Sequence, residues 1–253
     1  MREMLLLGLV LMAIAVLPVL AETKGDVKLP AKDKVKIFLL VGQSNMAGRG
    51  KVEDQDREAP ARVITLTKGD AWAPAVDPIH FDKPRAGVGL GRTFGLVVAA
   101  KYEDETIALV PCAVGGTSID QWERSGAQHK EAVRRAKIAM KDGELAGILW
   151  HQGETRSDPA TYTEKVSKVL EGFREELGAK DVPIVVGELG HFYKGAEALN
   201  PVLQKLPETL AKSACVSTKG LTDQGDKTHF DAASYREMGK RYAAAWLMLV
   251  DRK

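Results

Sequence analysis

Residues that build covalent or metal-bound frameworks are scarce in this sequence. Only two of its 253 residues are cysteine, Cys112 and Cys215. No spacing of Cys and His resembles a metal site, so neither a metal nor another cofactor is expected. The two cysteines lie far apart in the sequence, and spacing alone does not decide whether they form a disulfide.

The chain also lacks an excess of charge of one sign. Its 36 Lys and Arg against 34 Asp and Glu leave a formal net charge of +2. A nucleic-acid partner would require a clustered basic face, so none is expected. Internal repeats, low-complexity tracts and linkers are absent too, and 253 residues suffice for one sizeable α/β domain.

One long apolar run stands at the start of the chain. Arg2 precedes it, it extends from Met4 to Leu20, and the small residue Ala21 follows. This order is typical of a secretory signal peptide covering residues 1–21. It predicts a secreted or periplasmic protein with a single domain over residues 22–253 and no membrane contact after cleavage. An uncleaved anchor is the alternative, because the run approaches the length that spans a bilayer.

Apolar runs that resemble strands alternate with amphipathic segments along the rest of the chain. The runs are continuous, as in parallel strands that are buried on both faces. They predict a three-layer α/β/α sandwich with a mostly parallel central sheet. The predicted strands are Val35–Val41, Val63–Leu66, Thr106–Pro111, Leu145–Trp150, Val182–Glu188 and Ala214–Ser217. The predicted helices are Gly91–Tyr102, Ala127–Lys141, Pro159–Leu177, Ala196–Lys212 and Ala232–Val250, the last capped by Asp231.

Polar residues flanked by glycine follow four of these strands. Ligands bind beyond the carboxyl ends of the strands in open α/β sheets, so these segments are expected to meet at one cleft. They are Gly42-Gln43-Ser44-Asn45, the stretch from Cys112 to Ser118, His151-Gln152-Gly153-Glu154 and Gly187-Glu188-Leu189-Gly190-His191.

Ser44 follows the first predicted strand, at a turn that would expose its hydroxyl at the sheet edge. A serine hydroxyl becomes a useful nucleophile when an oriented imidazole removes its proton. His229 is the candidate base, and Asp226 would orient its ring and stabilise the imidazolium. Each motif has an ordinary alternative, because Ser44 could simply cap the next helix and the segment 226–229 could be a surface turn.

Acyl transfer also needs donors for the oxyanion that forms during the reaction. The backbone N–H of Ser44 is one candidate. Gly115 or Gly116 would supply a second N–H, because a residue without Cβ lets the backbone approach the substrate. The side-chain amide of Gln152 is the third candidate. The alternatives are a plain turn for the two glycines and a solvated loop for Gln152.

Other polar residues at the strand ends have less defined roles. Glu154 either holds the loop of Gln152 or competes with Asp226 as the acidic partner of a histidine. His151 and His191 are expected to be structural or to contact substrate, rather than to act as the base.

Four blocks, taken together and in order, resemble the conserved blocks of SGNH hydrolases. The chain is more specifically similar to the sialate O-acetylesterase-like branch, which includes acetylxylan esterases of carbohydrate esterase family 6. The resemblance extends from about Val35 to about Ala245. Its blocks are Gly42-Gln43-Ser44-Asn45-Met46-Ala47-Gly48, Cys112-Ala113-Val114-Gly115-Gly116-Thr117-Ser118, Trp150-His151-Gln152-Gly153-Glu154 and Asp226-Lys227-Thr228-His229-Phe230.

The resemblance implies a flavodoxin-like fold and metal-free ester hydrolysis. It implies Ser44 as nucleophile, His229 as base and Asp226 as its partner. It also implies an oxyanion hole formed by Ser44, a glycine (Gly115 is preferred) and Gln152, where many other superfamily members carry asparagine. The branch pattern that is matched by residues 72–78 is expected to pack a loop against the sheet.

The expected function is that of a serine esterase that removes O-acetyl groups from carbohydrate through an acetyl-enzyme. Acetylated xylan, a related polysaccharide and acetylated sialic acid all remain open as substrates, and the oligomeric state is not determined. Aromatic residues make up only 6% of the chain and the strand-end loops are polar, which favours a sugar over an acyl chain. The alternatives are a lipid or aryl esterase and a catalytically silent carbohydrate-binding protein. Candidate substrate contacts are Gln43, Asn45, Gly116, Glu154 and Trp122, although Trp122 could equally belong to the core.

Overall fold

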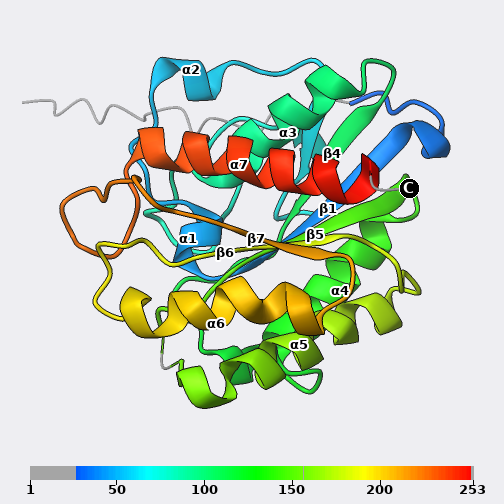
Figure 1. The fold of residues 1–253 in the computed structure, drawn as a ribbon. Coiled ribbons are helices and arrows are strands. Elements are labelled where there is room, and N and C mark those ends of the chain that lie inside the picture. The colour runs from blue at the N-terminus through cyan, green and yellow to red at the C-terminus, as the bar shows by residue number, and fades with distance from the viewer. Residues whose placement is uncertain (1–26, 156, 252–253) are drawn as a thin grey trace, which may run out of the picture.

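A computed structural model describes residues 27–155 and 157–251, which fold around one seven-stranded sheet (Figure 1). The strand order is β3-β2-β4-β1-β5-β6-β7. Every neighbouring pair is parallel except β2 and β3. The strands are β1 (Val35–Gly42), β2 (Val63–Leu66), β3 (Trp72–Pro74), β4 (Thr106–Pro111), β5 (Glu144–His151), β6 (Ile184–Gly187) and β7 (Ser213–Val216). The expected signal peptide, residues 1–21, lies outside the described residues.

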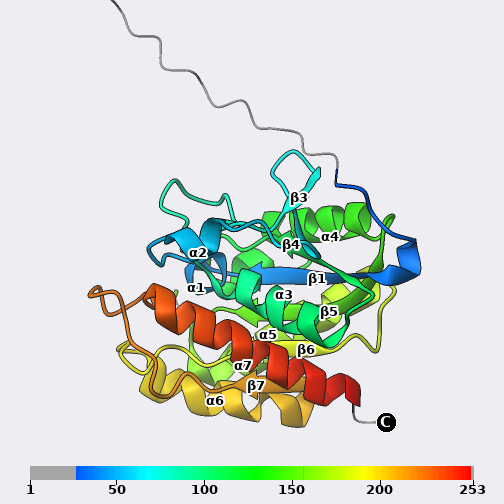
Figure 2. The ribbon, with the colours of Figure 1, turned by 90° about the horizontal axis from the view of Figure 1, so that it is seen from above.

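Helices cover both faces of the sheet, which confirms the predicted three-layer α/β/α sandwich. The helices α3 and α7 lie on one face, and α4, α5 and α6 lie on the other (Figures 1 and 2). The long helices are α3 (Leu90–Lys101), α4 (Ala127–Ala139), α5 (Pro159–Glu176), α6 (Ala196–Thr209) and α7 (Ala232–Asp251). The short elements are α1 (Ser44–Ala47), α2 (Asp54–Arg57), and the 3-10 turns η1 (Lys32–Lys34) and η2 (Ile119–Trp122).

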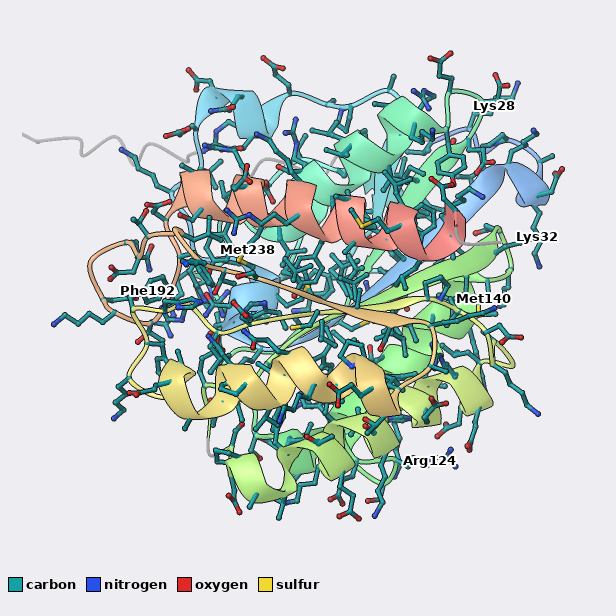
Figure 3. All side chains as sticks on the ribbon, in the orientation of Figure 1. Lys28, Lys32, Arg124, Met140, Phe192 and Met238 are labelled. Atoms are coloured by element: carbon teal, nitrogen blue, oxygen red, sulfur yellow. The ribbon has the colours of Figure 1, made fainter. Side chains whose placement is uncertain are left out.

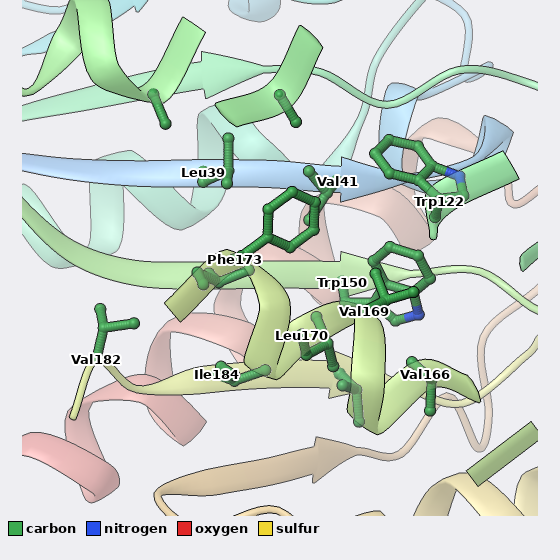
Figure 4. Close-up of a cluster of buried hydrophobic side chains, with 14 of the residues drawn as sticks. Leu39, Val41, Trp122, Trp150, Val166, Val169, Leu170, Phe173, Val182 and Ile184 are labelled. Atoms are coloured by element: carbon green, nitrogen blue, oxygen red, sulfur yellow. The ribbon is translucent and has the colours of Figure 1, made fainter. Parts of the chain in front are cut away.

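The central strand β1 shows why a continuous apolar run becomes a buried parallel strand. Its side chains alternate between the two faces, so Ile37, Leu39 and Val41 join the cluster beneath α4, α5 and α6. Phe38 and Leu40 join the cluster beneath α3 and α7. All five side chains are fully buried. Figure 4 shows Leu39 and Val41 packed with aromatic and branched side chains of the first cluster.

Apart from the 3-10 turns, two elements were not expected from the sequence, and both are short. The edge strand β3 spans three residues and pairs antiparallel with β2. Its tryptophan, Trp72, donates from Nε1 to Asp142 Oδ2 at 2.9 Å. The helix α2 has only four residues, all of them polar, so it has no pattern of apolar residues from which it could be predicted. Asp231 does cap α7, accepting from the backbone N–H of Ser234 at 2.7 Å.

The two cysteines lie on different parts of the sheet. Cys112 directly follows β4, whereas Cys215 belongs to β7, and β1, β5 and β6 lie between these strands. Both thiols are free. Burial raises the pKa of each thiol to about 12. No disulfide therefore joins them.

The strand order places the three most informative loops side by side. From β1 the chain crosses to β2 and β4 on one side, then continues with β5 on the other. The loops after β4 and β5 thus flank the end of β1, a position where open α/β sheets bind ligands. Figure 3 shows Phe192, in the loop after β6, at this carboxyl edge, with Lys28 and Lys32 at the opposite edge. Among the residues described, no helix is long and apolar enough to cross a membrane.

Candidate active site

Ser44 is the first residue of α1 and follows β1 after a sharp turn. The turn requires Gly42, because its φ is +125° and an added Cβ would lie 2.1 Å from the carbonyl oxygen of His151. The backbone N–H of Gln43 then donates to the same carbonyl at 2.9 Å. These contacts fix the end of β1 against β5 and leave Ser44 at the carboxyl edge of the sheet.

The loop before α7 brings His229 and Asp226 to the same place. Asp226 Oδ1 accepts from the backbone N–H groups of Thr228 and His229 at 2.9 and 2.7 Å. Lys227 between them adopts a left-handed conformation, with φ of +54°. The backbone of residues 226–229 therefore forms a turn at the surface, as the alternative interpretation expected. The turn also aims the side chain of His229 at the end of β1.

Three side chains form one hydrogen-bonded chain across a separation of 185 residues. His229 Nε2 lies 3.0 Å from Ser44 Oγ, and His229 Nδ1 lies 2.6 Å from Asp226 Oδ2. Because a carboxylate only accepts, Nδ1 carries the proton and Nε2 is left to accept from the hydroxyl. The three expected residues are thus arranged as nucleophile, base and orienting acid would be.

Hydrogen bonds keep Asp226 in its charged form. Partial burial raises the pKa of this carboxyl, but bonds from the backbone and ring of His229, from Gln224 and from the backbone of Thr228 together outweigh it. The pKa therefore lies well below the ordinary value of an aspartate. A carboxylate that stays ionised can stabilise the imidazolium that forms when the base takes a proton.

The structure corrects the expectation for Gly115. Its N–H donates to Asp82 Oδ2 at 2.8 Å, so it is not a free oxyanion donor. Asp82 is held in turn by Arg49, with Nη2 at 2.7 Å from Oδ2, and both side chains are almost fully buried. Gly116 differs, because it is exposed, has φ of +81° and faces open space. No hydrogen bond of the described residues uses the Gly116 N–H.

Gln152 is fully buried and connects three segments. Its Nε2 donates to Gln43 Oε1 at 3.2 Å and to the carbonyl oxygen of Thr117 at 3.1 Å. Its Oε1 accepts from the hydroxyl of Tyr162 at 2.8 Å. The amide therefore joins the loops after β1, β4 and β5, and the expected alternative of a solvated loop is wrong.

Asn45 and Gln43 were expected to contact substrate, but both are buried and bonded within the protein, Gln43 through its Oε1. Asn45 Nδ2 donates to Glu154 Oε1 and to the carbonyl oxygen of Thr228, and Asn45 Oδ1 accepts from the hydroxyl of Tyr235. These bonds attach the Ser44 turn to the loops of Glu154 and His229. They use both N–H donors of the Asn45 amide.

Glu154 takes the first of its two expected roles, since it holds loops and does not touch His229. Its side chain is only 3% exposed, and burial raises the pKa of its carboxyl. Its Oε1 lies 3.9 Å from Nε2 of His151, which is itself fully buried. His151 Nδ1 bonds the hydroxyl of Tyr242, so His151 is structural, whereas the exposed His191 pairs with Glu188.

Trp122 belongs to the core and cannot line a cleft. The side chain is fully buried, and its ring packs edge-on against Trp150 with centroids 5.4 Å apart. Figure 4 shows the two rings together within the apolar cluster. Its Nε1 donates to the hydroxyl of Thr117 at 3.0 Å. The expected aromatic wall for a sugar is therefore not at this position.

Sequence reasoning missed the buried ion pair beside the site. Arg49 directly follows the first motif block and Asp82 lies in a long irregular segment, and neither belongs to a sequence pattern that indicates pairing. The fold explains the glycine at position 115, where an added Cβ would lie 2.4 Å from Arg49 Nη2. Within the described ranges, no cluster of His, Cys, Asp and Glu could hold a metal ion.

Comparison with protein families identifies the chain. The model of a carbohydrate esterase family, described as sialic acid-specific acetylesterases, matches residues 34–248. The chain belongs to this family. The matched span includes every strand and all the site residues described above. The narrower placement among acetylxylan esterases stays a prediction.

Individual relatives agree with this membership. The family relative "Probable carbohydrate esterase At4g34215" of Arabidopsis thaliana is 31% identical, over 89% of this chain and 95% of its own. The solved structure of Arabidopsis AT4G34215 superposes with a TM-score of 0.78 and 28% identity, covering 84% of this chain and 98% of that one. A carbohydrate acetylesterase from Xanthomonas citri, XAC1771, is 18% identical with a TM-score of 0.61. It covers 84% of this chain and 55% of its own, and it supports the fold alone.

Proposed function

We propose that this carbohydrate esterase homologue is a serine esterase that removes O-acetyl groups from carbohydrate. The observation that carries the proposal is the hydrogen-bonded chain from Ser44 Oγ through His229 to Asp226. Acyl transfer to a serine requires a general base that activates the hydroxyl, and His229 is placed to be that base. Membership of a carbohydrate esterase family supports an O-acetyl ester of a carbohydrate as the substrate.

The proposed reaction has two halves. Ser44 Oγ attacks the acetyl carbonyl carbon while His229 Nε2 takes the hydroxyl proton, and the imidazolium returns that proton to the departing sugar oxygen. Water then loses a proton to Nε2 as it attacks the carbonyl carbon of the acetyl-enzyme. The imidazolium returns that proton to Ser44 Oγ as its bond to the acetyl carbon breaks, and acetic acid leaves and ionises to acetate. Asp226 holds the ring in the required tautomer through both halves.

The oxyanion would be bound by backbone and amide donors. The N–H of Ser44 is one, and Gly116 replaces Gly115 as the proposed second because the Gly115 N–H already binds Asp82. Gln152 is the proposed third donor. Its bonds to neutral oxygens are long, at 3.1 and 3.2 Å, and a charged oxygen is a stronger acceptor.

Acetate release tests the proposal. The substrates are acetylated xylan, O-acetylated sialic acid, 4-nitrophenyl acetate and a long-chain 4-nitrophenyl ester, each offered to the protein and to Ser44→Ala. We expect release from at least one saccharide that falls at least about a thousandfold in the variant. Similar circular dichroism spectra would show that both proteins are folded.

Three other results would contradict the proposal. Preference for the long-chain ester would indicate a lipid esterase. Cleavage of the aryl acetate alone would indicate an esterase of another substrate class. Failure of a fluorophosphonate to label Ser44, together with saccharide binding, would indicate a silent binding protein. Secretion remains a separate proposal that rests on residues 1–21.

A further inference from the structure

Phe81 is an exposed aromatic residue close to the candidate active site. Among the described residues, only two large apolar side chains are exposed to solvent, Phe81 at 40% and Met248 at 62%. Met248 lies on α7, which covers the opposite face of the sheet from α4. Phe81 instead directly precedes Asp82, the carboxylate that binds the N–H of Gly115.

The ring of Phe81 is held from one side. The guanidinium carbon of Arg135, on α4, lies 4.9 Å from the ring centroid. Arg135 is itself fixed by bonds to Asp70 Oδ1 at 2.6 Å and to the carbonyl oxygens of Leu66 and Thr67. One face of the ring is therefore covered by a buried cation, and the exposed part is presented in a fixed orientation.

A cavity of about 80 Å³ adjoins the ring. Its lining includes His80, Phe81, Asp82, Val114 and Gln128. His80 is only 3% exposed, and neither of its ring nitrogens has a hydrogen-bond partner among the described residues. Such a group indicates a polar ligand or water, because a buried polar atom without a partner is unfavourable.

Burial also sets the charge of His80. It lowers the pKa of the imidazole to about 3, so the ring is neutral at ordinary pH. A neutral imidazole offers one donor and one acceptor, which matches the hydroxyl of a sugar. The cavity is too small for a sugar ring, but it is large enough for a hydroxyl or hydroxymethyl substituent.

Asp82 connects this cavity to the surroundings of the nucleophile. Asp82 Oδ2 lies 2.8 Å from the Gly115 nitrogen. A Cβ built on Gly115 would lie 3.0 Å from that oxygen and 3.5 Å from Ser44 Cβ. Asp82, which lines the cavity and follows Phe81 in the chain, is therefore packed against the residue that lies beside Ser44.

We propose that Phe81 and His80 form a subsite for the sugar unit next to the acetylated one, so that the substrate is an acetylated oligosaccharide or polysaccharide. The proposal rests on the proposed function of Ser44. The open side of the phenyl ring packs against the C–H face of the pyranose, and a hydroxyl of that sugar enters the cavity and bonds His80. The aromatic contact expected of Trp122 is thereby made by Phe81.

The proposed subsite is tested by varying the length of the saccharide substrate. KM and kcat are measured for the full chain and for Phe81→Ala with acetylated xylotetraose, acetylated xylose and 4-nitrophenyl acetate. We expect KM for the tetraose to rise about tenfold in the variant, the factor that an aromatic contact of this kind supports. The kcat for the tetraose and both parameters for the two small substrates should stay within twofold.

Three variants serve as controls. Met248→Ala removes the other exposed apolar side chain and should change none of the parameters. Phe81→Trp keeps an aromatic surface and should retain the preference for the tetraose. His80→Leu removes both ring nitrogens and should raise KM for the tetraose alone. An equal loss on all three substrates in Phe81→Ala, or an unchanged KM for the tetraose, would overturn the proposal.

Binding separates this proposal from the proposed function. Calorimetry with unacetylated xylotetraose requires no catalysis. If no saccharide ester is cleaved, binding that weakens about tenfold in Phe81→Ala would still support the subsite, while the esterase assignment would fail. Absence of binding, or equal binding by both proteins, would overturn the subsite and leave the Ser44 mechanism untouched.

Discussion

The two sides of the candidate active site are built differently. The loop that carries Asp226 and His229 lies at the surface, with the Asp226 side chain 42% exposed. On the other side, Gln152 is fully buried and each end of its amide is bonded to another segment. On the first side, one local turn positions the residues that move the proton. On the second side, the amide proposed to bind the oxyanion also holds three loops together.

This difference determines what a substitution should change. On the exposed side, polar groups that lose a partner regain water, so the effect should fall on activity. On the buried side, a lost partner leaves polar groups without water, so activity and the free energy of unfolding should fall together. Measuring both quantities for each variant tests the comparison.

The largest effect is expected for Asp226→Asn. The variant keeps an oxygen for the backbone N–H groups of Thr228 and His229, but its amide would impose the wrong tautomer on His229. We expect kcat to fall about 10⁴-fold and the melting temperature to stay nearly unchanged.

Asp223→Asn is the matched control for this loop. Asp223 Oδ2 accepts from the backbone N–H groups of Gly225 and Lys227 and does not touch His229. Its replacement should leave kcat within a few-fold. A comparable loss of kcat in both variants would show that Asp226 acts only by shaping the turn.

A smaller loss of activity, accompanied by a loss of stability, is expected for Gln152→Ala. Removing an oxyanion donor lowers kcat by roughly 10²–10³-fold. Gln43 Oε1, the Thr117 carbonyl and the Tyr162 hydroxyl would each lose a buried partner, at a cost of about 1–3 kcal/mol in the free energy of unfolding.

Tyr162→Phe separates these two consequences. It removes the hydroxyl that bonds Gln152 Oε1, the Gln152 carbonyl and Trp150 Nε1, but it keeps the Gln152 amide, so stability should fall more than kcat does. Denaturant unfolding and steady-state kinetics give both numbers. Unchanged stability in Gln152→Ala would contradict the role of this amide as a connection between loops.

Alanine at the two neighbouring glycines should act differently. At Gly115 the new methyl would meet Arg49 Nη2 at 2.4 Å, which disturbs the pair with Asp82 and lowers stability by about 1–3 kcal/mol. At Gly116 the methyl meets open space. The positive φ there costs about 1 kcal/mol, and kcat should fall about tenfold as the proposed donor shifts. Equal melting temperatures for the two variants would contradict the packing argument.

The smallest effect on activity is expected for His151→Gln, which should alter how stability depends on pH. Burial lowers the pKa of His151 to about 3, whereas the unfolded value is about 6.5. Below pH 6.5 the unfolded chain binds a proton that the folded chain does not, so stability falls as the pH falls. Between pH 7 and 5 this single group removes about 2 kcal/mol.

Urea unfolding at both pH values measures this contribution. The variant should lose correspondingly less stability than the unaltered protein between pH 7 and pH 5. His80→Gln offers a comparison, because burial also lowers the pKa of His80 to about 3. The same pH dependence in His151→Gln and in the unaltered protein would show that His151 is charged in the fold.

Local pattern predicted most of the elements, and it failed where elements were short. Every predicted strand and long helix is present, because continuous apolar runs and helical periods are strong signals. The strand β3 was missed because three edge residues show no period. The positions of Ser44, Asp226 and His229 at sheet-edge loops were predicted as well, because turn and strand signals flank them.

The amino-acid sequence by itself determined the layered α/β architecture and the residues that stand at the strand ends, because these follow from local hydrophobic pattern. Only the tertiary structure decided which polar group each one meets. It placed Asp82 on the N–H of Gly115, Trp122 in the core and Phe81 at the surface. The physical reason is that hydrogen-bond partners and burial depend on which distant segments pack together. The local pattern of a single segment does not determine the strand order β4-β1-β5.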